Sequence, residues 1–244
     1  MESSSSKNLG YPLGYLFSLY TFCVFFSFPF ILWRYGFYGL LGSNLLRYST
    51  LTIDYYTSNA TKYNMTILDK NGFDSKNILK MSIIRLLVGS FIIGSLFVYL
   101  FKGAESHFDL YLIRNVAISL AVTEIYFMIM HQTMHRYFPE LHKLHHCCLR
   151  SSHTSNLFFG NMDIFLEFHL PLIIAYSFNV FLLNDTFTSI ASIACIYTWY
   201  IMDHDEYIKL PHWYHHYYIN SNYGAYSKSG AFDNKDALKK NILR

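Results

Sequence analysis

The sequence MIMHQTMHRYFPELHKLHHCC, residues 128–148, decides the fold and carries five histidines within sixteen residues. These are His131, His135, His142, His145 and His146. Residues three or four apart lie on one face of a helix, so the rings of each group would point the same way. Neutral imidazole is the commonest metal ligand in proteins. We therefore predict that this stretch forms helices with a metal-binding face.

The spacing His-x2-His-His of HKLHH recurs near the C-terminus in PHWYHH. A further histidine, His204, lies eight residues before the first histidine of this second block. The two blocks together hold more histidines than the four ligands that close one zinc site, and Gln132 stands where a zinc protease needs glutamate. A dinuclear iron site suits so many imidazoles better. The predicted metal ligands are His131, His135, His142, His145, His146, His204, His212, His215 and His216.

The composition argues against a water-soluble domain. Apolar residues make up 52% of the 244 residues, whereas charged residues make up only 14%, well below the roughly 25% of soluble domains. A net charge of +3 is too small to indicate a nucleic-acid partner. The four cysteines show neither disulfide nor zinc-finger spacing.

Five apolar runs could cross or enter a bilayer about 30 Å thick. They cover residues 11–33, 78–101, 110–130, 164–183 and 186–202. We expect residues 36–56 to form an interfacial helix and the polar residues 57–77 to form a loop. The predicted fold is all-α, an integral membrane bundle of four to five transmembrane helices with a cytosolic histidine-rich metal site.

The order of these runs gives an independent check on the metal site. Two runs separate the histidine blocks, so both blocks should emerge on the same side of a membrane. Fifteen of the nineteen Lys and Arg residues also fall on that side, against only Lys7 and Lys102 on the other. The positive-inside rule therefore predicts that the histidines face the cytosol.

Other polar residues near these blocks have two interpretations each. Glu124, two helical turns before His131, would accept a hydrogen bond from the ring N–H of a metal-binding histidine without binding the metal itself, or would lie near the membrane surface. His169, within an apolar run, would support the site or lie at the interface. His107, on the far side, is expected to be an ordinary hydrogen-bonded residue. Further candidates for supporting carboxylates are Asp163, Asp203 and Asp205.

The motifs HQTMH, HKLHH, an apolar hairpin, DHDEYIKLP and HWYHHYYINSNYGAY together resemble the fatty acid hydroxylase superfamily of membrane di-iron enzymes. The resemblance covers about residues 120–226. The tail with Asn222, Tyr223, Gly224 and Tyr226 is most similar to that of sterol C-5 desaturases.

This resemblance implies that the nine histidines hold two iron ions and that O2 is a co-substrate. It implies hydroxylation or desaturation of a C–H bond in a sterol or in a long-chain fatty acyl or sphingoid lipid. It also implies an endoplasmic-reticulum membrane location and electrons from a b-type cytochrome with an NAD(P)H-dependent reductase. The chain would then divide into a membrane-anchor region (1–109), a catalytic region (110–226) and a tail (227–244).

The sequence also departs from the family pattern. Gln132 replaces the usual arginine, and the gap RYFPEL between the first two boxes is short. GNMD, from Gly160 to Asp163, stands where relatives carry His-Pro-x-acid, and the family's Trp-Asp and Phe-Gly-Thr tail is absent. His153 would replace the missing ligand or would be a surface residue. The alternative function is therefore a non-catalytic metal- or lipid-binding membrane protein derived from the same family.

Overall fold

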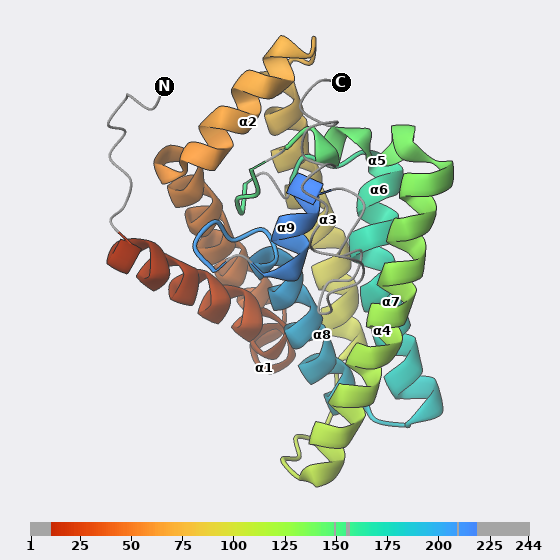
Figure 1. Ribbon diagram of the computed structural model, residues 1–244. Coiled ribbons are helices and arrows are strands. Elements are labelled where there is room, and N and C mark those ends of the chain that lie inside the picture. The colour runs from red at the N-terminus through yellow and green to blue at the C-terminus, as the bar shows by residue number, and fades with distance from the viewer. Residues whose placement is uncertain (1–10, 149, 155–156, 209, 219–244) are drawn as a thin grey trace.

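The computed structural model describes residues 11–148, 150–154, 157–208 and 210–218, which contain helices and no strand. The predicted all-α class is confirmed. Figure 1 shows long helices lying along one another, with α2 and α5 at the same end. The elements are α1 (Tyr11–Thr57), α2 (Asn59–Lys70), α3 (Ser75–Leu100), α4 (Leu110–Tyr137), α5 (Pro139–His146), α6 (Asn161–Ile164), η2 (Phe165–His169), α7 (Leu170–Ser177), η3 (Phe178–Leu182), α8 (Thr186–Met202) and α9 (Pro211–Tyr218).

Four helical segments are long and apolar enough to cross a membrane. They are Pro12–Thr57, Ser75–Leu100, Leu110–Tyr137 and Asn161–Leu182, and the shorter apolar helix Thr186–Met202 completes the hairpin. Each apolar run predicted from the sequence therefore corresponds to a helix. The fourth segment contains two π-helical turns, η2 and η3.

Helix α1 is longer than the predicted first run and consists of two halves that meet at Gly36. This residue has φ 55° and ψ −131°, a conformation that glycine adopts without the steric penalty of a Cβ. The first half contributes Phe25, Phe28 and Leu32 to the core, which also contains Ile190 and Ile193 of α8. The predicted interfacial helix over 36–56 is thus the second half of α1.

The prediction of a loop over residues 57–77 was wrong, because most of this stretch is α2. Ser58 caps the helix, and its side chain accepts a hydrogen bond from the Thr61 N–H at 3.2 Å. Leu68 is fully buried, although the helix as a whole is polar. Tertiary packing of a narrow apolar face therefore stabilises a helix whose composition resembled that of a loop.

Polar contacts at the two ends of the bundle confirm the predicted order of the helices. At one end, the Asn64 side chain of α2 accepts a hydrogen bond from the Arg150 N–H, just beyond α5, at 3.2 Å. At the opposite end, His107 Nε2 lies 3.1 Å from Asp185 Oδ2, in the turn before α8. Both histidine blocks therefore emerge at the end that carries α2 and α5.

The contact between α1 and α3 yields the first testable prediction. A Cβ added at Gly94 would lie 2.3 Å from Leu40 Cδ1, and Leu40 is fully buried. We expect Gly94→Ala to destabilise the protein by about 1–3 kcal/mol through overpacking. Gly89→Ala on the same helix is the matched control, because nothing lies within 4 Å of its added Cβ. Thermal unfolding in detergent should show a lower Tm for Gly94→Ala alone, and equal Tm values would contradict this packing.

Candidate metal centre

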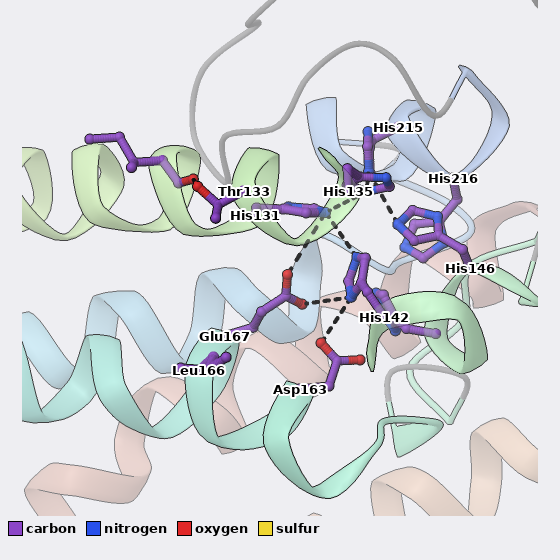
Figure 2. A network of polar contacts seen from close by, with 12 residues as sticks. His131, Thr133, His135, His142, His146, Asp163, Leu166, Glu167, His215 and His216 are labelled. Carbon is purple, nitrogen blue, oxygen red and sulfur yellow. Dashed lines mark hydrogen bonds and ion pairs between the residues drawn. The ribbon is translucent and has the colours of Figure 1, made fainter. Parts of the chain in front are cut away.

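The nine histidines predicted as ligands come from four places in the chain and meet at one end of the bundle. Helix α4 contributes two, α5 three, the segment after α8 one and α9 three. Figure 2 shows rings from α4, α5 and α9 pointing toward one another above the turn that carries Asp163 and Glu167. Segments that are 80 residues apart in the sequence thus share one polar cluster.

Five of these rings form the first set, which we call the five-histidine set. Nε2 of His131 lies 3.1 Å from Nε2 of His135 and 3.0 Å from Nε2 of His142. Nε2 of His215 lies 2.9 Å from Nε2 of His135 and 3.3 Å from Nε2 of His146. One nitrogen of each ring therefore points into the same small volume.

The other four rings form the four-histidine set. Nε2 of His204 lies 3.3 Å from Nε2 of His145 and 3.1 Å from Nε2 of His216. His212 belongs to the same group, because ligand atoms of all four residues lie within 4.8 Å of one another. All four side chains are buried.

The two sets are direct neighbours. The ring centroids of His142 and His145 are 5.2 Å apart, and those of His146 and His216 are 4.9 Å apart. Because His145 and His146 are consecutive residues of α5, one short helix supplies ligands to both sets. The geometry therefore suits two ions held side by side.

Hydrogen bonding alone does not satisfy the five-histidine set. His142 Nδ1 lies 2.8 Å from Asp163 Oδ1, so Nδ1 carries the proton and Nε2 presents a lone pair. His131 Nε2 can donate its single proton to His142 or to His135, but not to both. At least one close nitrogen pair then lacks a shared proton, and a cation between the nitrogens removes this repulsion.

The nitrogen–nitrogen distances also match those between ligands of one ion. Two nitrogens about 2.1 Å from a metal lie roughly 3.0 Å apart at an octahedral angle and roughly 3.4 Å apart at a tetrahedral angle. The closest pairs in both sets lie between 2.9 and 3.3 Å. The residues present therefore fit transition-metal ions.

Two hydrogen bonds from outside the nitrogen cluster orient ligand rings. Asp163 fixes the tautomer of His142, as described above, which is the contact expected of a supporting carboxylate. His204 Nδ1 lies 3.2 Å from the Tyr200 carbonyl oxygen, to which it donates its proton. In both rings the proton on Nδ1 leaves the Nε2 lone pair available for a metal.

Glu167 is a site residue that the sequence reasoning missed. Its carboxylate oxygens lie 3.8 Å from His131 Nε2 and 3.7 Å from His142 Nδ1, and the side chain is buried. Glu167 belongs to the π-helical turn η2, a type of turn that often occurs at functional sites. Its position inside an apolar run was the signal that could have identified it.

Six of the rings beyond the apolar helices are neutral at pH 7. Burial, reinforced by neighbouring rings, lowers the pKa of His142, His145, His146, His212 and His216 well below that of ordinary imidazole. Burial likewise lowers the pKa of His204 to about 3. Each of these rings takes up a proton at a higher pH in the unfolded chain than in the folded protein. The folded cluster therefore loses stability as the pH falls below about 6.5.

The structure answers the question about His153, which is not one of the converging rings. Its Nε2 lies 3.1 Å from Asp205 Oδ2, and its Nδ1 lies 3.2 Å from the Ile201 carbonyl oxygen. Burial, the largest single effect, opposes its charge, but the hydrogen bond to Asp205, the charges of Asp205 and Asp54 and the hydrogen bond to Ile201 together raise the pKa of His153. A ring that donates from both nitrogens has no lone pair for a metal, so His153 does not replace a ligand at Gly160.

The remaining residues that the sequence singled out include Asp203, His107 and His169. Asp203 is buried, and burial, followed by the charge of Glu124, raises its pKa well above the usual carboxyl value. His107 is hydrogen-bonded at the far end of the bundle, as predicted. His169 lines an apolar cavity beside α3. The motif residues Asn222, Tyr223, Gly224 and Tyr226 lie outside the described residues.

Comparison of the chain with protein-family models, with curated proteins and with solved structures finds no match. The functional argument therefore rests on the geometry of the site.

The division into two sets gives a prediction about metal content. We expect the purified protein to bind close to two metal ions, and we expect His145→Ala and His215→Ala each to lower the metal content because each opens a coordination position in a different set. His107→Ala, at the far end of the bundle, is the matched control and should retain both ions. Elemental analysis of detergent-purified protein measures this. Full metal content in both ligand variants would refute the assignment.

The contact between Asp163 and His142 gives a second prediction. Asp163→Asn keeps the shape of the side chain but removes the charge that holds the His142 proton. We expect metal affinity to fall by about 10- to 100-fold, as is typical when such an orienting carboxylate is lost. Asp109→Asn, which alters the exposed N-cap of α4, serves as the control. Competition with a chelator measures the affinity, and equal affinities in the two variants would contradict the orienting role.

Proposed function

We propose that this chain is a membrane oxidoreductase of the di-iron type that uses O2 to hydroxylate or desaturate a C–H bond of a lipid. The proposal includes the relationship to the fatty acid hydroxylase superfamily suggested by the histidine motifs. Two iron ions, when bound, would supply the activation of O2 that this reaction needs. The observation that carries the proposal is the convergence of nine histidine rings into two adjacent sets.

The number and type of ligands support iron rather than a structural zinc ion. A structural zinc site closes with four ligands, often cysteine thiolates, and needs no second ion at its side. Here imidazoles dominate, and a buried pair of carboxylates, Asp163 and Glu167, lies next to the five-histidine set. Neutral imidazole with carboxylate suits iron in oxygen-handling sites.

Aromatic side chains beside the four-histidine set offer a place for the reacting carbon. A small cavity there is lined by four aromatic residues, three histidines of the set and two carboxyl side chains: Phe127, Phe159, Phe168, Tyr200, His145, His204, His212, Glu167 and Asp203. The Phe159 ring stacks on His145 with centroids 4.1 Å apart. These rings would exclude water from the metals and position an apolar chain against them.

The surrounding membrane and the partners follow from the same proposal. Four helices of suitable length and apolarity support insertion in a bilayer. The excess of Lys and Arg that the sequence predicts on the histidine side of the membrane supports a cytosolic orientation in the endoplasmic-reticulum membrane. A b-type cytochrome, reduced by an NAD(P)H-dependent reductase, would then deliver electrons from the cytosolic side.

Expression of the chain in cells tests this function. We expect a sterol or a long-chain lipid to gain an oxygen atom or a double bond, only under aerobic conditions and not with His145→Ala or His215→Ala. The Gly42→Ala variant should retain the activity, because nothing lies within 4 Å of its added Cβ. Lipid profiling by mass spectrometry measures the product. An unchanged lipidome, with the metals bound and reductant supplied, would favour the non-catalytic alternative.

A further inference from the structure

A buried arginine lies in the apolar part of the bundle, away from the metal ligands. Arg47, in the second half of α1, is only 4% exposed. Its guanidinium donates hydrogen bonds to the Tyr197 hydroxyl and to Asn44 Oδ1, and it lies 3.8 Å from the centre of the Phe28 ring. In the described part of the chain, no carboxylate lies within ion-pair distance of it.

The charge of Arg47 is therefore not neutralised by its protein neighbours. A buried charge is strongly destabilising unless an opposite charge or several hydrogen bonds compensate it. Two neutral acceptors and one aromatic face give part of this compensation. The Nε–H group of Arg47 is buried and has no acceptor among the described residues. The edge formed by Nε and a terminal nitrogen is the one that binds a carboxylate with two parallel hydrogen bonds.

Arg47 also lies where two apolar cavities meet. Leu86, Ser90, Phe168 and Tyr197 line both cavities together with Arg47. The space between side chains, including the open mouth, is about 490 Å³ in one cavity and about 510 Å³ in the other. Among their lining residues are two arginines and one histidine but no carboxylate. The pocket is thus apolar in its walls and positive in its charge.

The second cavity contains two further polar groups that face this charge. Arg85 lies on its wall, and its guanidinium donates to the Phe159 carbonyl oxygen at 2.8 Å. His169 lies on the same wall, and its buried Nδ1 has no hydrogen-bond partner among the described residues. Both groups can donate to an anion. The polar groups of the pocket therefore favour a negatively charged ligand over a neutral one.

Aromatic rings connect this pocket with the metal centre. Phe168 lines both cavities at Arg47 and also the small cavity beside the four-histidine set. Its ring centroid lies 5.3 Å from that of Tyr197 and 6.2 Å from that of Tyr200. The Tyr200 ring in turn lies 5.1 Å from Phe127, which is 5.8 Å from His212. An apolar chain attached to a group at Arg47 would run along these rings toward the histidines.

We propose that Arg47 binds the carboxylate of a long-chain amphiphile whose hydrocarbon chain extends past Phe168 to the metal centre. A carboxylate matches the Nε edge and the charge of Arg47, the one fully buried arginine of the pocket, because the half-buried Arg85 already donates to the Phe159 carbonyl oxygen. A phosphate headgroup would bring a second negative charge. This inference names a substrate class for the proposed function and rests on it for the reaction. The binding step itself depends only on the pocket.

The experiment compares ligands that differ only in the head group. Hexadecanoate, hexadecan-1-ol and hexadecyl phosphate are titrated against the metal-loaded protein in detergent, under argon and without reductant, so that no turnover occurs. Acetate is tested as a competitor, to separate recognition of the anion alone from recognition of the amphiphile. The variants are Arg47→Gln and, as the matched control, Arg114→Gln, which alters an exposed arginine of α4.

We expect hexadecanoate to bind about tenfold or more tightly than the alcohol, as is typical of a charge-assisted pair of hydrogen bonds. Arg47→Gln should abolish this preference while leaving binding of the alcohol unchanged, and Arg114→Gln should retain it. Equal binding of acid and alcohol to the wild-type protein would overturn the inference without any variant. Tighter binding of the phosphate, or competition by acetate at the concentrations at which hexadecanoate binds, would also overturn it.

The results separate this inference from the proposed function. Selective binding of the acid without any aerobic oxidation product would leave the pocket established and refute the oxidoreductase. An oxidised lipid formed equally well by wild-type protein and Arg47→Gln would establish the oxidoreductase and refute the role of Arg47.

Discussion

The arrangement of the chain depends on the burial of imidazole nitrogens that face one another. Nine imidazole rings lose water on folding, and each Nε2 can share at most one proton with the nitrogens around it. Bound metal ions would convert these unfavourable contacts into favourable coordination. The ions would also hold together α4, α5, α9 and the segment after α8. Metal binding and the final packing of these helices are therefore coupled.

The ligands are supported by a buried polar network that reaches back to α1. Asp54 Oδ2 accepts a hydrogen bond from the Thr154 N–H at 2.8 Å, and the hydroxyls of Thr61 and Ser152 lie 2.7 Å apart. The segment held in this way carries His153, whose ion pair with Asp205 fixes the residue next to the ligand His204. Asp205 also accepts hydrogen bonds from two backbone N–H groups that follow it. A misplaced α1 would therefore displace a ligand 150 residues away.

Much of this arrangement could be predicted from the sequence, because it depends on strong local signals. Histidine spacing identified all nine converging rings, and long apolar runs identified the helices that position them. Signals that depend on tertiary context were missed. Helix α2 is polar and has a narrow buried face, and Glu167 lies at the site in a π-helical turn that its apolar surroundings in the sequence did not predict. The buried position of Arg47 was likewise invisible, because an arginine in a mixed segment is ordinarily exposed.

The break at Gly36 connects these observations. An unbroken α1 would continue in the direction of its first half, which packs on α8 through Phe25 and Phe28. The change of direction at Gly36 produces a second half that carries both Arg47 and Asp54, seven residues or two helical turns apart. Arg47 faces the apolar pocket, whereas Asp54 holds the segment that supports His204. One helical segment therefore carries both the proposed head-group site and the carboxylate that helps to position His204, so a shift of this segment would move both together.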